Sequence, residues 1–143
     1  MRIAAATIAA AAVLGLTTPA LAEQPASASV RFDFETGAAT GKIMVALYDT
    51  AEAYDGGAPV RAAQVDVAAG ARDAVFADLP AGDYAMKAFH DVNGDGRMNT
   101  NPFGMPTEPF AFSNNARGNM GPASWDRARF SVSGESAQTI AIR

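Results

Sequence analysis

The sequence contains no cysteine, which excludes a disulfide framework, a thiol nucleophile and any cysteine-ligated metal centre. Histidine is almost absent as well, because His90 is the only one. Ser113 and Ser124 have no recognisable activating context, so we assign no catalytic residue and expect no enzyme activity. The chain also lacks a basic run and has a formal net charge of −4, so we do not expect nucleic acid as a partner.

Only one long hydrophobic run is present, and it stands at the start of the chain. Arg2 precedes an apolar segment over 3–16, and Ala20, Leu21 and Ala22 have the small-residue pattern of a cleavage site. These features are typical of a signal peptide, so we predict cleavage after Ala22 and export to the periplasm or the medium. The run is too short to span a bilayer comfortably and no second run follows, so we expect no transmembrane anchor.

The remaining sequence predicts one domain built from short strands. Residues 23–29 are small and we expect a mobile lead-in, followed by a single domain over 30–143. Residues 30–35 alternate apolar and charged side chains, whereas residues 42–49 are apolar on both faces, as in a central strand. Further strands are expected at 60–67, 73–79, 84–90, 128–132 and 139–142. The pattern predicts an all-β fold, an antiparallel β-sandwich of about seven strands of the transthyretin-like or immunoglobulin-like kind.

One long stretch, over 101–125, breaks this strand pattern. It has no sustained periodicity, and loops of this length are usually functional or disordered. It nevertheless carries six large apolar side chains, namely Phe103, Met105, Phe110, Phe112, Met120 and Trp125. So many apolar groups favour an ordered excursion that packs on the end of the sandwich and presents an interaction surface.

The segment H-D-V-N-G-D-G-R-M-N-T-N, over 90–101, resembles the front half of a calcium loop. Five groups fall at the first five ligand positions of an EF-hand-type loop: Asp91, Asn93, Asp95, the Arg97 carbonyl and Asn99. Position twelve is Pro102, so Glu108 is the nearest acid that the excursion can bring back to the loop. We expect weak Ca²⁺ binding, on the order of 0.1 to 1 mM, and no other cofactor. The competing interpretation is a metal-free turn in which the Asp and Asn side chains cap their own backbone.

A second candidate site surrounds the single histidine. A pocket lined by His90, Glu108, Asn114, Asn115 and Arg117 would suit a small molecule or glycan, either as a binding site or as that of a hydrolase. The competing interpretation is structural, with His90 hydrogen-bonded, the two asparagines at left-handed turn positions and Arg117 paired with a nearby acid. A further alternative is a purely structural cell-envelope domain.

Four motifs stand between residues 79 and 118: L-P-A-G-D-Y, H-D-V-N-G-D-G, G-M-P-T-E and F-S-N-N. In these motifs the chain resembles the exported bacterial family called domain of unknown function 2141. The resemblance implies an exported, strand-rich domain, places Glu108 in the same motif set as Asp91, and brings no established activity. Asn99 stands where the family pattern has Asp, which weakens the calcium interpretation. The L-P-A-G-D-Y turn is also similar to that of transthyretin-like and carboxypeptidase-regulatory-like sandwiches, which are commonly non-catalytic accessory domains.

We therefore predict a non-catalytic, exported β-sandwich domain. It binds Ca²⁺ weakly at the 91–99 loop and uses the 101–125 excursion to contact an envelope or extracellular protein or a glycan.

Overall fold

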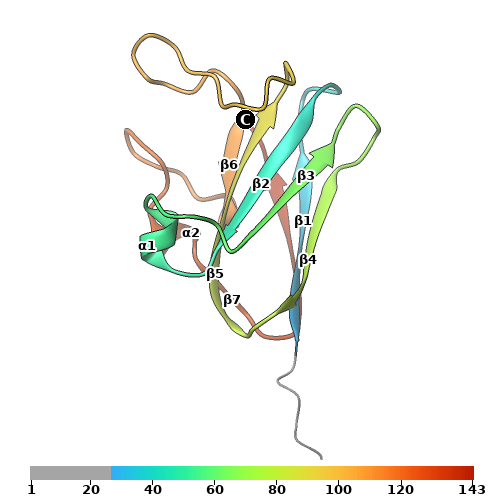
Figure 1. Cartoon of the computed structure of the whole chain (residues 1–143), viewed down its shortest axis with the longest axis vertical. Helices are drawn as coiled ribbons and strands as arrows, with labels where there is room; N and C mark the ends of the chain where they lie inside the picture. Colours follow the sequence, from blue (N-terminus) through green and yellow to red (C-terminus); the bar gives the residue numbers. More distant parts are fainter. Residues whose placement is uncertain (1–26) are drawn as a thin grey trace, which may run out of the picture.

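The computed structural model describes residues 27–143, which form two packed β-sheets (Figure 1). The strands are β1 (Ala28–Glu35), β2 (Lys42–Tyr48), β3 (Arg61–Asp66), β4 (Asp73–Leu79), β5 (Gly82–Asp91), β6 (Phe110–Phe112), β7 (Phe130–Val132) and β8 (Glu135–Ala141). One sheet has the order β4-β1-β8, and the other has the order β3-β2-β5-β6 with β7 also pairing with β5. The all-β sandwich predicted from the sequence is confirmed. The predicted signal peptide lies outside the described residues.

Helices contribute little to the described chain. They are α1 (Ala51–Tyr54), α2 (Trp125–Ala128) and the 3₁₀ turn η1 (Ser113–Asn115). The Thr50 side chain accepts a hydrogen bond from the Ala53 N–H and so caps α1. None of the helices within residues 27–143 has the length and apolar character needed to cross a membrane.

The hydrophobic core lies between the two sheets and follows the alternation of the sequence. Val30, Phe32 and Phe34 of β1 are buried and face the other sheet, while the charged residues between them are more exposed. Ile43 and Leu47 of β2 are fully buried in the same core. The strand β2 lies between β3 and β5, which confirms the central position predicted from its two apolar faces.

One strand pair differs from the predicted antiparallel arrangement. The strands β1 and β8 are parallel, with Val30 opposite Ser136 and Phe34 opposite Ile140. The chain leaves β7, turns at Gly134, and starts β8 next to the start of β1, where the Ser29 N–H donates to the Gly134 carbonyl at 2.8 Å. Alternation of side chains is the same in parallel and antiparallel strands, so the sequence pattern could not distinguish them.

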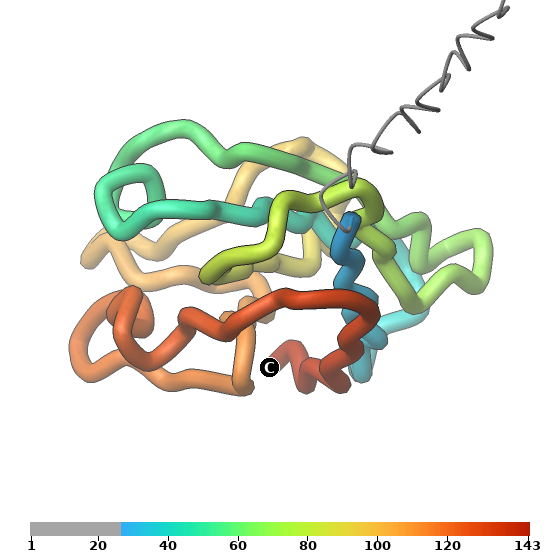
Figure 2. The backbone as a smooth tube through the Cα atoms, turned by 90° about the horizontal axis from the view of Figure 1, so that it is seen from below, coloured from blue at the N-terminus to red at the C-terminus, as the bar shows by residue number. Residues whose placement is uncertain are grey.

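The 101–125 excursion is ordered and includes regular structure that the sequence pattern did not predict. Its residues Phe110–Phe112 form β6, which pairs with residues 87–89 of β5. Three residues are too few to produce a recognisable period. Figure 2 shows α1 and the orange segments at the side of the molecule opposite to β1. The excursion therefore extends the second sheet at its edge.

Two strands share one edge of β5, and a side chain fills the gap between them. The strand β7 pairs with residues 82–84 and β6 with residues 87–89, so the Met86 N–H between them has no strand partner. The buried Ser113 hydroxyl accepts this N–H at 2.9 Å and donates to the Ala128 carbonyl. This serine thus completes the sheet and fixes the start of η1.

Replacement of a core aromatic tests this packing. Phe32 is fully buried and contacts the rings of Phe34, Phe76 and Phe130, so Phe32→Ala should lower the free energy of unfolding by about 3–5 kcal/mol. The matched control is Val75→Ala, because Val75 lies on the exposed face of the same sheet and is 56% exposed. Denaturant unfolding measures both, and a Val75 effect as large as that of Phe32 would contradict the assignment of the core.

Candidate functional site

The loop after β5 is folded around one buried carboxylate. Asp91, the last residue of β5, is 3% exposed. Its Oδ1 accepts the N–H groups of Gly94 and Asp95 at 2.9 and 3.2 Å, and its Oδ2 accepts that of Gly96 at 2.7 Å. Gly94 and Gly96 both have positive φ, which lets the N–H groups of three successive residues point inward to this carboxylate. Asp91 therefore determines the path of the chain that follows it.

A second buried carboxylate holds the two ends of the loop together. Glu108 Oε1 accepts the Val92 N–H and its Oε2 accepts the Asn99 N–H, both at 3.2 Å. Within residues 27–143 neither Asp91 nor Glu108 forms an ion pair. Among the described residues, backbone N–H groups are the hydrogen-bond donors to these two carboxylates, and they offset the cost of their desolvation. Glu108 thus lies against the loop, where the sequence analysis expected it.

The exposed side of the loop is linked by amide side chains. Asn93 Nδ2 donates to Asn99 Oδ1 at 3.0 Å, and Asn99 Nδ2 donates to Asp95 Oδ2 at 2.8 Å. The hydrogen bond from Asn99 holds the pKa of Asp95 below its ordinary value, and the backbone N–H of Arg97 adds to this effect. The five loop residues expected at the calcium site and Glu108 therefore share one hydrogen-bond network.

Residues 27–143 contain no group of three or more His, Cys, Asp or Glu side chains arranged to hold a metal ion. The side-chain oxygens of Asp91 and Glu108 point to backbone N–H groups, which is the geometry that the metal-free turn also requires. Ca²⁺ binding at this loop stays a prediction.

The single histidine lies inside the protein. His90 is fully buried, and its Nε2 donates to the Thr40 carbonyl at 2.6 Å, because a carbonyl can only accept. Its Nδ1 lies 2.7 Å from the Thr36 hydroxyl. Both ring nitrogens thus join β5 to the turn after β1, and His90 lines neither of the two hollows described below.

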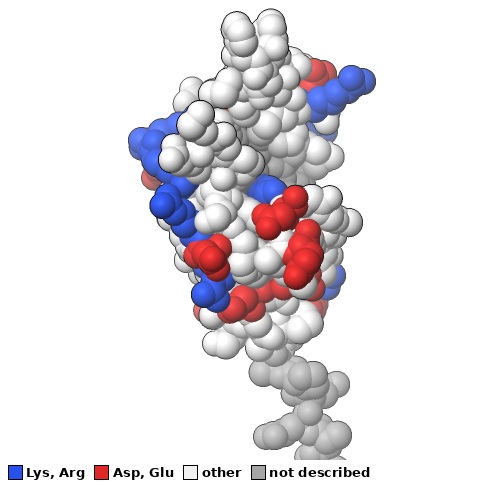
Figure 3. All heavy atoms as spheres, turned by 90° about the vertical axis from the view of Figure 1, so that its left-hand side faces the viewer, with Lys and Arg blue, Asp and Glu red and all other residues white. Residues whose placement is uncertain are grey.

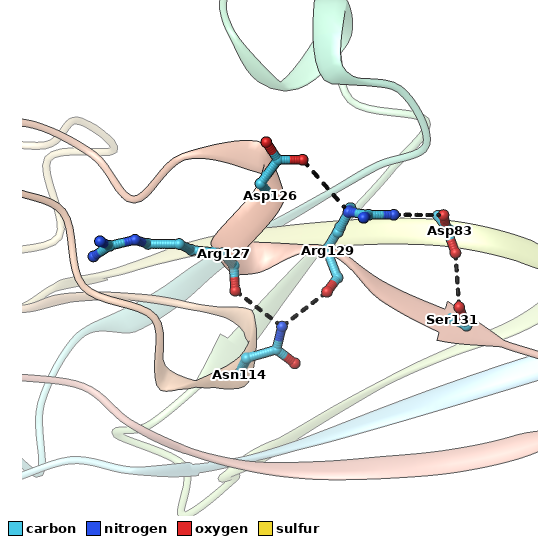
Figure 4. A network of polar contacts seen from close by, with 6 residues as sticks. All are labelled: Asp83, Asn114, Asp126, Arg127, Arg129 and Ser131. Carbon is cyan, nitrogen blue, oxygen red and sulfur yellow. Dashed lines mark hydrogen bonds and ion pairs between the residues drawn. The ribbon is translucent and has the colours of Figure 1, made fainter.

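The two asparagines of the F-S-N-N motif bind backbone. Asn114 and Asn115 have φ values of 61° and 50°, in the left-handed region that asparagine tolerates. Asn114 Nδ2 donates to the carbonyls of Arg127 and Arg129 at 3.1 and 2.9 Å (Figure 4). Asn115 in turn donates to a backbone carbonyl and accepts a backbone N–H of β8. The pair fastens the excursion to α2 and β8.

Figure 4 also shows how α2 is connected to β5. The Arg129 guanidinium lies 3.3 Å from Asp83 and 3.6 Å from Asp126, and the Ser131 hydroxyl donates to Asp83 at 2.8 Å. All these groups are solvent-exposed, so the ion pairs orient side chains and add little stability.

The residues of the second candidate site do not form one pocket. Asn115 and Arg117 line a hollow of about 450 Å³ next to β6 and the C-terminal residues, without His90, Glu108 or Asn114. Arg117 is exposed and forms no ion pair in the described part of the chain. The structure therefore separates a buried histidine and glutamate from an exposed arginine.

A larger groove, which sequence reasoning missed, lies on the outer face of the second sheet. It has a volume of about 1030 Å³, and two loops form its walls, residues 98–106 and residues 118–122. Its lining includes the outward-facing residues Met44, Ala46, Tyr48, Ala62, Gln64, Lys87, Phe89, Phe110 and Phe112. The second apolar face of β2 was the signal for it, because an outer sheet face exposed to water is normally polar.

One charged residue, Lys87, lines this groove. Its ammonium group donates to the Tyr54 carbonyl and lies 4.1 Å from the centre of the Tyr54 ring and 5.3 Å from that of Tyr48. Desolvation lowers the pKa of Lys87, and burial raises the pKa of Tyr54 to about 12. The Tyr54 hydroxyl donates to the Ala123 carbonyl at 2.8 Å, so α1 and the excursion meet at this end of the groove.

A family model described as uncharacterized protein conserved in bacteria, DUF2141, matches residues 35–141. The chain belongs to DUF2141. This confirms the family resemblance seen in the motifs. No curated protein and no solved structure matched the chain, so the similarity to transthyretin-like sandwiches stays a prediction.

One wall of the groove in this DUF2141 chain is a tightly closed loop. A Cβ atom on Gly118 would lie 1.7 Å from the Gly121 carbonyl oxygen, so only glycine permits this approach of the backbone. Between them Met120 has a φ of 59° and a completely exposed side chain. A methionine held in a left-handed conformation and in water is energetically unfavourable, which points to a role outside folding.

Removal of the Glu108 carboxylate tests its role as a clamp. Glu108→Ala should lower the free energy of unfolding by about 1–3 kcal/mol, because two part-buried N–H groups lose their acceptor. Amide hydrogen exchange should lose protection at Val92 and Asn99. Glu135→Ala, an exposed glutamate on β8, is the control and should change neither quantity. Retained protection of both amides would show that Glu108 does not hold the loop.

Proposed function

We propose that this chain is a non-catalytic, exported binding domain that holds its ligand in the groove between the second sheet and the 101–125 excursion. The observation that carries the proposal is the groove itself, about 1030 Å³ of concave surface whose lining includes one charged residue. Concave, largely apolar sites with a few polar groups are the usual form of ligand sites in proteins. Export rests on the signal-peptide pattern before residue 23.

Exposed apolar side chains around the groove support a binding role. Phe103 is 90% exposed, Met105 60% and Met120 101%, and all three belong to the two loops that form the walls. Large apolar side chains exposed to water do not stabilise the fold, and their clustering is typical of an interaction site. Figure 3 shows this side of the molecule, with charged groups mainly toward its edges and lower part and an uncharged upper centre.

The surroundings of the nucleophilic and basic groups support binding rather than catalysis. His90 is fully buried, with both ring nitrogens hydrogen-bonded. Ser113 is fully buried, and its hydroxyl joins two backbone groups. Neither residue lines the groove.

Filling the groove tests the proposal. The neutral dye Nile red, which fluoresces in apolar surroundings, should bind the mature protein. Ala46→Phe, on the groove floor, should weaken this binding about tenfold or more, because the new ring occupies the site. Ala137→Phe is the matched control, since Ala137 is exposed on β8 of the other sheet and should leave dye binding unchanged.

Circular dichroism of both variants checks that each one folds. Absence of dye binding to the unaltered protein, or equal binding by a folded Ala46→Phe variant, would reject the groove as the binding site.

A second proposed property is weak calcium binding at the 91–99 loop. Two features favour it: the expected ligand residues share one hydrogen-bonded loop, and two buried carboxylates there have no cationic partner within residues 27–143. Glu108 connects this loop to the excursion. A bound cation would therefore also stiffen the base of one groove wall.

Thermal unfolding in EDTA and in about 10 mM calcium tests this property. For a dissociation constant of about 1 mM, mass action adds about 1.4 kcal/mol and raises Tm on the order of 4 to 8 °C. Magnesium should raise Tm less than calcium does. Asp95→Asn replaces an exposed carboxylate with an amide of nearly the same shape, and it should abolish the rise in Tm with calcium. Coincident melting curves in EDTA and calcium would leave the loop as a metal-free turn.

A further inference from the structure

The groove has a polar end and an apolar end, and this asymmetry indicates the class of its ligand. We propose that the groove binds a single-chain amphiphile with one anionic head, a long-chain carboxylate, whose head lies at Lys87 and whose hydrocarbon chain runs between the two loops. The inference rests on the proposed function of the groove as a ligand site.

The register of the strands defines the two ends. Across the sheet, Lys87 lies in one row with Ala46 and Phe112. The next outward-facing row, about 7 Å along β5, contains Met44, Phe89 and Phe110. A head at Lys87 thus places the start of a hydrocarbon chain directly on an apolar row.

Two aromatic rings lie on one side of Lys87, and the apolar row lies on the other side. Tyr48, which lines the groove, and Tyr54 pack edge to face, with ring centres 5.6 Å apart. On the other side, Met98 of the 91–99 loop and Met105 of the excursion line the groove beyond the apolar row. In the proposed arrangement the head lies beside the two rings, and the hydrocarbon chain extends toward these methionines.

The positive charge of Lys87 in the groove lining favours a ligand with an anionic head. Among residues 27–143, Lys87 is the sole charged residue that lines the groove. Asp55 is near enough to act on the pKa of Lys87, but it neither lines the groove nor forms an ion pair with the ammonium group. The ammonium group has three N–H donors, of which the Tyr54 carbonyl accepts one. The remaining donors and the partly desolvated charge suit a carboxylate, which can accept two hydrogen bonds.

The side chains that would surround the hydrocarbon chain of the ligand are apolar and adaptable. Four of the six methionines, Met44, Met98, Met105 and Met120, line this one groove. Methionine has three rotatable bonds and a polarisable sulfur, so it adapts to flexible apolar ligands. The small Ala46 and Ala62, opposite each other on β2 and β3, leave room above the floor.

Displacement of bound Nile red from the mature protein tests the proposal. Oleate should displace the dye, while oleyl alcohol, which has the same chain and a neutral head, should bind about tenfold more weakly. Lys87→Met should reduce oleate affinity about tenfold and remove the difference between the two compounds. The matched control is Lys42→Met, because Lys42 is the other lysine of the chain and does not line the groove.

The outcomes separate this inference from the proposed function. Equal affinity for oleate and oleyl alcohol in the unaltered protein overturns the anionic-head assignment, even when Ala46→Phe still blocks the dye. Failure of both compounds to displace the dye, together with binding to phosphatidylglycerol vesicles, overturns it in favour of docking on a bilayer. When Lys87→Met does not fold, Lys87→Arg, which keeps the charge, and the comparison of head groups on the unaltered protein decide the question.

Discussion

The rest of the structure depends on the hydrogen bonds along one edge of β5. Two short strands, β6 and β7, share this edge, and the Ser113 hydroxyl takes the one N–H that lies between them. A buried N–H without an acceptor is costly, so this serine decides where β6 ends and η1 begins. The position of the excursion, and with it the wall of the groove, follows from that local requirement.

Most of the polar residues that the sequence analysis singled out form hydrogen bonds with backbone groups. Asp91 and Glu108 hold the loop through N–H groups, and Asn114 and Asn115 hold the excursion through carbonyl and N–H groups. His90 does the same between β5 and an earlier turn. An irregular segment cannot satisfy its own backbone groups as a strand does, so it needs such side chains. The motifs by which the chain resembles DUF2141 thus include residues that build the scaffold around the groove.

The sequence predicted the fold better than the site. Alternation in β1 and the two apolar faces of β2 gave the correct strands, because burial on one or both faces imposes a period of two. The parallel pairing of β1 with β8 was missed, since alternation carries no direction. The calcium-type spacing singled out five residues, from Asp91 to Asn99, that share one hydrogen-bonded loop. That spacing cannot tell whether their oxygens face a cation or the backbone, because both arrangements need the same inward turn.

The groove escaped prediction for a different reason. Its members, from Met44 on β2 to Met105 in the excursion, are distant in sequence and share no spacing. One property of the sequence nevertheless required it. The strand β2 is apolar on both faces, and only the inner face is covered by the core. The outer face must then be covered by something else. The excursion covers part of it and leaves a groove of about 1030 Å³ above Ala46, with Lys87 beside it.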